Sequence, residues 1–281
     1  MKTIITAFAL LMVVSINAQN FQGKAIYKTS QKSTFKIKDD KSTGMDAAMQ
    51  EEIRQRFQKM NQKTYILNFD KNTSTYKQEV KLKSPTAAIT GKGLRVFSLG
   101  SGGDTDIYFK NIQKNTFANK TEIQGKIFLI KDELPKHNWE LSSETKNIGQ
   151  YTCYKATYSK EVEKKKISMV KGEQKEAITK ETIVTTAWYT PEIPLTNGPA
   201  NYQGLPGLIL EVNDGKKIIV CTEIILNPKE KITIQEPKKG KVISQKKFDK
   251  IRKQKSEEML EKMKGRNGLD LGNGVNIKFT G

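Results

Sequence analysis

The chain has 281 residues, and its 49 lysine and arginine residues against 30 aspartate and glutamate residues give a formal net charge of +19 at pH 7. Hydrophobic residues make up 36% of the chain, which is lean for a globular protein but too many for a disordered one. A single histidine, His137, excludes a zinc site with two histidine ligands and the HExxH motif of metalloproteases. The length suggests one large domain or two small ones, and we expect no metal and no cofactor.

Residues 1–18 have the pattern of a secretory signal peptide. Lys2 supplies a positive charge, residues 4–14 form a short apolar stretch, and Ile16 and Ala18 precede the expected cleavage site. The stretch is shorter than the roughly 20 residues of a membrane-spanning helix. No cysteine follows it, which excludes a lipid anchor at that position. We expect an exported protein that is either free in the periplasm or associated with the inner face of the outer membrane.

A series of later segments has the alternation or the apolar runs of β-strands and is rich in Ile, Val, Thr and Tyr. The predicted strands are 21–27, 64–69, 74–82, 106–109, 126–131, 151–158, 182–189, 208–212 and 217–226. The turn Asn213-Asp214-Gly215 predicts a tight hairpin between the last two. No βαβ alternation occurs, so the sheet should be antiparallel. We expect a mainly β (α+β) fold, a curved antiparallel sheet that forms an open half-barrel like that of lipoprotein carriers.

Two segments have helical spacing of their apolar residues. Residues 45–62, after the first strand, carry Met49 and Ile53 at this spacing, and residues 244–264 carry Phe248 and others among many charges. Each stripe is more typical of packing against a sheet than of cofactor binding. We therefore expect one helix after the first strand and a basic helix near the C-terminus.

The remaining long stretches have the composition of loops. Residues 84–105 are rich in glycine, and residues 160–180 form a charged excursion between two strands. Residues 229–266 carry 14 lysine and arginine residues against 6 acidic ones. The expected organisation is a signal peptide at 1–18, a β-rich domain at 19–236 and a basic helical extension at 237–281.

The positive charge has two interpretations. A solvated surface that keeps the protein soluble is one, and an anionic partner such as envelope lipid, lipopolysaccharide or an acidic protein surface is the other. A nucleic-acid partner is not expected, because the chain is exported and its aromatic residues are not interleaved with the basic runs. Cys153 and Cys221 lie in predicted strands, where either a disulfide or two buried free thiols would fit.

Residues 187–211 are the most informative stretch. A strand end at 187–189 runs into a loop with four prolines and three glycines, followed by a second apolar strand. Prolines stiffen such a loop, and glycines allow close backbone approach. A rigid loop can be a preformed binding surface or a structural corner. The candidate binding residues are Trp188, Tyr189, Glu192, Asn197 and Tyr202.

This stretch resembles the GLPGLI family of exported bacterial proteins. Residues 204–209 read GLPGLI, residues 187–194 read AWYTPEIP, and the resemblance extends through 197–199 and upstream to Trp139 and the YTCYKAT run at 151–157. The resemblance implies an exported, mainly β protein, often associated with TonB-dependent outer-membrane receptors. It supplies no catalytic residues.

Three functional hypotheses follow. The first is a periplasmic binding or carrier module for a hydrophobic or amphipathic ligand, held on a concave apolar face. The second is an interaction protein that contacts an outer-membrane receptor through the rigid loop at 187–209. The third is an enzyme using His137 or carboxylates, with Asp132, Glu133, Glu144 and Glu192 as the candidate acids. No nucleophile elbow or cofactor motif accompanies these residues, so we expect a non-enzymatic protein with no catalytic residues.

Overall fold

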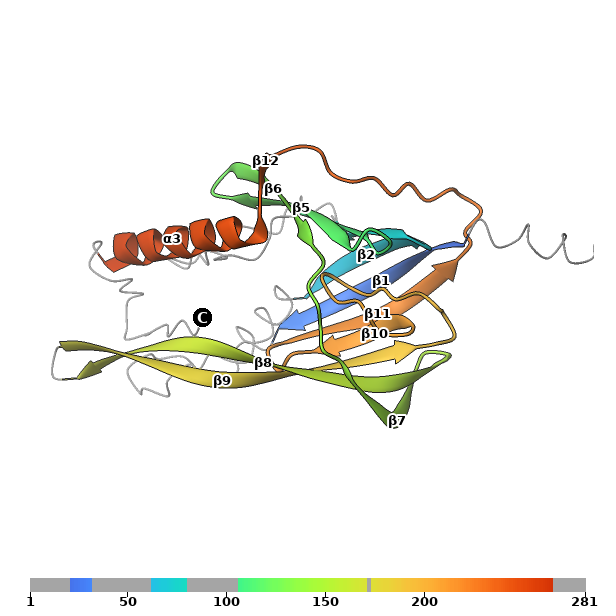
Figure 1. The fold of residues 1–281 in the computed structure, drawn as a ribbon, viewed down its shortest axis with the longest axis horizontal. Helices are drawn as coiled ribbons and strands as arrows, with labels where there is room; N and C mark the ends of the chain where they lie inside the picture. Colours follow the sequence, from blue (N-terminus) through green and yellow to red (C-terminus); the bar gives the residue numbers. More distant parts are fainter. Residues whose placement is uncertain (1–20, 32–61, 80–105, 171–172, 265–281) are drawn as a thin grey trace, which may run out of the picture.

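The computed structural model describes residues 21–31, 62–79, 106–170 and 173–264, which form one 12-stranded open sheet and a helix (Figure 1). The elements are β1 (Gln22–Gln31), β2 (Lys63–Asp70), β3 (Thr73–Gln78), β4 (Ile107–Asn111), β5 (Thr116–Ile123), β6 (Lys126–Glu133), β7 (Glu140–Ile148), β8 (Tyr151–Val170), β9 (Glu173–Thr190), β10 (Leu208–Asn213), β11 (Lys217–Leu226), β12 (Lys241–Ile243) and α3 (Gln245–Lys264).

The strand order in the sheet is β12-β6-β5-β4-β3-β2-β1-β11-β10-β9-β8-β7. Every neighbouring pair is antiparallel except β12 and β6, which run parallel. The prediction of a mainly β fold with an antiparallel sheet and a C-terminal helix is therefore confirmed. The hairpin at Asn213-Asp214-Gly215 is also confirmed, with Gly215 at φ +84. The signal peptide, the helix expected at 45–62 and the loop at 84–105 lie outside the described residues, apart from residue 62.

The connection from β6 to β7 requires the sheet to curve. These strands follow each other in the chain but lie ten positions apart in the sheet. At about 4.8 Å per strand, a flat sheet would separate them by about 48 Å. The residues at 134–139 that join them span at most about 25 Å. The sheet must therefore curl, with this short connection lying on its concave side. Figure 1 shows the connection running from β6 to β7 across the sheet.

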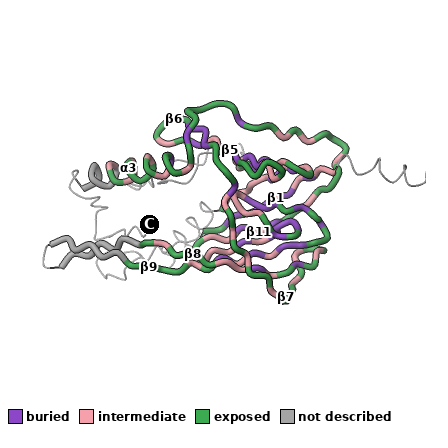
Figure 2. The backbone as a smooth tube through the Cα atoms, viewed as in Figure 1, coloured by how far each residue is buried: buried purple, intermediate pink, exposed green. Residues whose placement is uncertain are grey.

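The main hydrophobic core lies on that concave side. Tyr27, Leu67 and Phe69 of the central strands are fully buried there, together with Ala156 and Ala187 on β8 and β9, near the β7 edge of the sheet. The cross-strand register places Tyr27 beside Tyr65 and Leu67 beside Tyr76, so the inward residues follow the period of two that a strand requires. In Figure 2 the buried residues concentrate on the central strands.

Two smaller clusters hold the β4–β6 side. Phe128 and Ile130 of β6 pack against Ile243 and Phe248, so β12 and the start of α3 cover one face. On the opposite face, Ile234 packs on Phe109 and others. The segment that follows β11 thus crosses one side of the sheet before β12 joins its edge. Among the described residues, no helix combines the length and hydropathy needed to span a membrane.

The prediction of a loop at residues 160–180 is wrong. β8 and β9 pair continuously from Tyr154–Tyr189 to Val170–Glu173. β7 pairs with β8 only as far as Thr157, and β10 pairs with β9 only as far as Thr186. Residues 158–170 and 173–185 therefore form a two-stranded ribbon, hereafter the arm. Its charged sequence suggested a loop because a ribbon with no sheet neighbour needs no apolar alternation.

Cys153 and Cys221 are both buried free thiols. They lie on β8 and β11, which are separated in the sheet by β9 and β10. Three strand spacings amount to about 14 Å, twice the Cα separation of about 7 Å that a disulfide allows. Burial raises the pKa of Cys153 to about 11 and that of Cys221 to about 12, so both stay protonated at neutral pH.

Candidate functional site

The loop at 191–207 folds back onto the concave face of the sheet. Ile193, Leu195 and Leu205 are buried in the main core. The loop is also hydrogen-bonded to β10: Leu208 N donates to Ile193 O at 3.0 Å, and Ile209 N donates to Asn197 O at 2.9 Å. The proline- and glycine-rich loop is therefore a cover over the core.

Two of its glycines are required by close packing. A Cβ atom on Gly207 would lie 2.2 Å from the carbonyl oxygen of Thr190, and one on Gly198 would lie 2.7 Å from the Cβ of Ile209. Neither distance is tolerated between real atoms, so the loop can approach the strands this closely only where these side chains are absent. The sequence signal for this requirement is the spacing of glycines around the prolines.

A buried lysine lies beneath the loop. Lys110 of β4 is fully buried, and its Nζ donates to the carbonyl oxygens of Gly198 at 2.6 Å and Tyr202 at 3.1 Å. Burial lowers the pKa of this ammonium well below its usual 10.5. Sequence reasoning missed Lys110. Its only signal is an inward position in β4, two residues after Tyr108, where an apolar side chain is expected.

An aromatic cluster joins the loop to the β6–β7 connection and to the base of the arm. The ring of His137 lies 4.9 Å from that of Tyr158 and 5.6 Å from those of Trp139 and Tyr202, measured between centroids. Trp139 Nε1 donates to Gln203 O at 2.9 Å. The cluster therefore fixes three chain segments against each other.

The surroundings of His137 favour its neutral form. Burial lowers its pKa from 6.5; a hydrogen bond to Asn201 O opposes this, and the charges of Lys110 and Lys160 lower it further. In the window between the folded-state pKa and 6.5, the unfolded chain binds more protons than the folded one. The free energy of unfolding should therefore decrease as the pH falls through this window.

We expect wild-type protein to lose more stability than a His137→Gln variant between about pH 7 and pH 5. The measurement is urea unfolding of both proteins across this range. Carboxylate titration is common to both, so it cancels in the difference. Equal pH profiles would show that His137 does not titrate differently on folding.

The predicted binding residues do not converge on one place. Tyr189 and Asn197 are buried in the core, at 6% and 0% exposure, and Tyr202 stacks on His137. Glu192 accepts a hydrogen bond from Thr152 N at 2.9 Å at the start of β8. That these residues together bind a partner or ligand stays a prediction. The contacts of Asn197, Tyr202 and Glu192 hold the loop against the rest of the protein.

Trp188 belongs to a second group, on β7, β9 and β10. Lys146 Nζ lies 4.5 Å from the centroid of the Trp188 ring and 2.7 Å from Glu211 Oε2. Register places Trp188 opposite both Glu211 and Lys155. Lys155 in turn pairs with Glu144 at 2.7 Å. The result is a network of ion pairs and a cation–π contact across four strands, β7 to β10.

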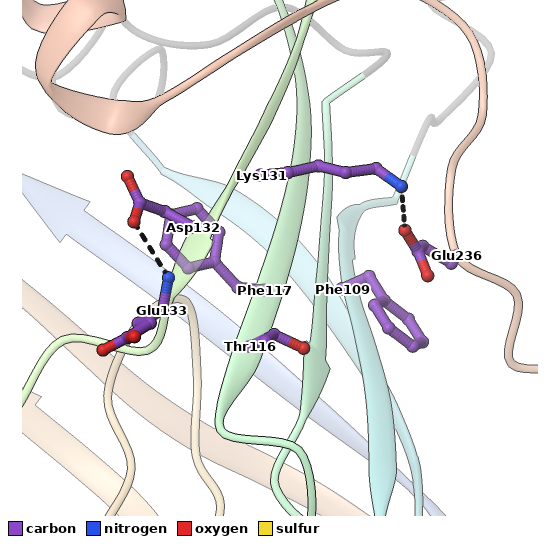
Figure 3. Close-up of a pocket in the computed structure, with 7 residues that line it drawn as sticks. All are labelled: Phe109, Thr116, Phe117, Lys131, Asp132, Glu133 and Glu236. Carbon is purple, nitrogen blue, oxygen red and sulfur yellow. Dashed lines mark hydrogen bonds and ion pairs between the residues drawn. The ribbon is translucent and has the colours of Figure 1, made fainter.

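The candidate acids of the enzyme hypothesis lie in different parts of the fold. Asp132 and Glu133 line a pocket of about 380 Å³ on β4–β6, with Phe109, Thr116, Phe117, Lys131 and Glu236 (Figure 3). There Lys131 pairs with Glu236 at 2.6 Å, and Asp132 accepts a hydrogen bond from Glu133 N. Glu144 and Glu192 lie elsewhere, at the β7–β8 edge. Within the described residues, no group of three or more potential ligands could hold a metal ion.

The fold and this site define a mainly β protein with one open, curved sheet, a covering loop and one C-terminal helix. Residues 139–211 match the model of the Porph_ging family, described as a protein of unknown function, which is the family that the GLPGLI hexapeptide names. The match covers Trp139, the arm and the covering loop. No curated protein matches the chain.

Comparison with solved structures gives distant similarities. Two crystal forms of PNGF-II, C2 and P21, are 12% identical with TM-scores of 0.46 and 0.47 over 84% of this chain. The chain spans only about a third of their length, 33% and 34%. LprF from Mycobacterium bovis is 10% identical with a TM-score of 0.25, over 79% of this chain and 92% of that one.

Proposed function

We propose that this protein is an exported, non-enzymatic interaction protein of the cell envelope and that the arm is its partner-binding element. The observation that carries the proposal is the thirteen successive residue pairs from Tyr158–Thr185 to Val170–Glu173, which extend beyond β7 and β10. At about 3.3 Å per residue, this ribbon reaches about 40 Å from the sheet.

A two-stranded ribbon by itself is only marginally stable in water, because it buries little surface. Beyond Thr185, which is buried at the base, the arm carries exposed side chains. Val184 is 52% exposed, and the side chains of Glu161 and Lys180, which form an ion pair at 3.9 Å, are each 70% exposed. The base of the arm is fixed through Tyr158 by the aromatic cluster. A projecting ribbon on a fixed base is suited to insertion into a partner or to pairing with it.

A carrier function for a hydrophobic or amphipathic ligand is the alternative, with envelope lipid as one source of that ligand. It requires an open apolar concavity. Over the central strands that space is occupied by Ile193, Leu195 and Leu205 of the covering loop. This packing favours the interaction hypothesis. The family resemblance makes a TonB-dependent outer-membrane receptor the first partner to test, with the protein on the periplasmic side.

The test is site-specific photo-crosslinking in the native host. A photoreactive residue at position 161 or 184 of the arm should give a discrete adduct with one envelope protein, identified by mass spectrometry. The matched control is position 223 on β11, which is exposed but outside the arm. Adducts of equal yield from position 223, or none from either arm position, would contradict the proposal.

A shortened arm provides a second readout. Residues 161–182 are replaced by Asn-Gly, which joins the paired residues Lys160 and Ile183 through a two-residue turn. The melting temperature should change by less than about 3 °C, because little of the core is lost. The crosslink from position 184 should disappear. Retention of the crosslink would overturn the assignment of the arm.

A further inference from the structure

The ammonium of Lys110 is buried without a counter-charge among the described residues. Two of its three N–H bonds are directed at the carbonyl oxygens of Gly198 and Tyr202. Carbonyl groups solvate an ammonium but do not neutralise it. In the described part of the chain, none of the salt bridges includes Lys110. Burial of an unpaired charge carries a large free-energy penalty. The penalty lowers the pKa of the amine, and a nearby anion would relieve it and favour the ammonium form.

Buried polar groups on the neighbouring strand β3 and in the covering loop have unused hydrogen-bonding capacity. Asn197 is fully buried, and because its Oδ1 accepts from Gly198 N at 2.8 Å, the unpartnered atom is the donor Nδ2. Ser74 lies directly opposite Lys110 in the β3–β4 register, and its Oγ is buried without a partner. The hydroxyl of Tyr76 is buried without a partner as well.

Hydrogen bonds connect the covering loop to the strands beneath it near Lys110. The carbonyl that accepts the shortest bond from Lys110 belongs to Gly198, the residue after Asn197. Asn197 O accepts from Ile209 N, and Ile209 O accepts from the hydroxyl of Tyr27 at 2.8 Å. The rings of Tyr27 and Tyr76 are in edge contact at 6.1 Å. Lys110 on β4 thus has Ser74 opposite it on β3 and the residue after Asn197 as its hydrogen-bond acceptor in the loop.

We propose that a small monovalent anion of the chloride class binds in this site, held by the Lys110 ammonium, the Asn197 amide and the Ser74 hydroxyl. An amide N–H can only donate, and hydroxyl groups can donate, so the set matches an acceptor with negative charge. One negative charge balances the one ammonium. A water molecule would accept these hydrogen bonds but would leave the ammonium uncompensated.

The direct test is anomalous diffraction from crystals of the mature protein grown in sodium bromide. A bromide peak within hydrogen-bonding distance of Lys110 Nζ and Asn197 Nδ2 is the expected result. Anomalous peaks confined to the protein surface, or a water molecule at this position without anomalous signal, would overturn the proposal.

A solution test uses Asn197→Asp, which keeps the oxygen that accepts from Gly198 N and places a carboxylate beside Lys110. The melting temperature of the wild type should rise by at least about 2 °C when gluconate is exchanged for chloride at constant ionic strength. Asn197→Asp should lose this rise. Asn147→Asp, the same change at an exposed position, should keep it. A chloride effect that persists in Asn197→Asp would contradict the proposed site.

Discussion

Replacing Gly207 by alanine should destabilise the protein by about 4 kcal/mol or prevent it from folding. The new Cβ would lie 2.2 Å from Thr190 O, 2.6 Å from Thr190 C and 2.9 Å from Pro191 N, all of them backbone atoms. A backbone cannot rotate away as a flexible side chain can. The loop would have to lift from the sheet, which would expose Ile193 and Leu205.

The measurement for Gly207→Ala is urea unfolding followed by tryptophan fluorescence. Gly125→Ala is the matched control, because Gly125 has φ +80 and no atom lies within 4 Å of the place that its Cβ would occupy. It should lose only about 1 kcal/mol, the strain of a left-handed alanine. If both variants lost the same stability, the close approach to Thr190 would not explain the glycine.

Replacing Phe248 by alanine should undock α3 while the rest of the sheet stays folded. Phe248 is 5% exposed, and its ring lies 5.7 Å from that of Phe128. Truncation of a buried phenylalanine removes about 3 kcal/mol of packing. Few other contacts between α3 and the sheet are available to compensate, since the described part of α3 packs mainly on β6.

The readout for Phe248→Ala is amide hydrogen exchange of residues 249–256, together with helical circular dichroism. Protection of these amides should fall by about 100-fold, while β1 and β2 keep their protection. Lys253→Ala, on an exposed position of the same helix, should leave the exchange unchanged. Unaltered protection in Phe248→Ala would show that α3 is held by other contacts.

Most strands with a buried face were predictable from the sequence, whereas β5, β7 and β12 were missed. β1, β2, β10 and β11 carry apolar alternation or apolar runs because the core lies against them. β5 was missed because its adjacent residues Phe117 and Ala118 are both buried, one in each of the two clusters on opposite faces of the sheet. The strand therefore lacks the alternation of apolar and polar residues that marks a strand with one buried face. β7 was missed because it is a polar edge strand, and β12 because three residues are too short for a pattern.

The site was predictable only in part. The covering loop was identified by its prolines and glycines, but whether its polar residues point outward or into the core depends on the sheet beneath it. Asn197 proved to be buried. Lys110 donates a hydrogen bond to the next residue of the loop, Gly198, which lies 88 positions away along the chain. Sequence spacing carries no information about contacts of that separation.

The sequence by itself determined the β-rich class, the C-terminal helix and the stiffness of the covering loop. These follow from local properties: period-two alternation, helical spacing and the fixed φ of proline. Only the tertiary structure decided the order of the strands in the sheet, the continuation of β8 and β9 into the arm and the burial of Lys110 beneath the loop. Each depends on which strands become neighbours, and neighbours in a sheet are chosen by packing over the whole chain.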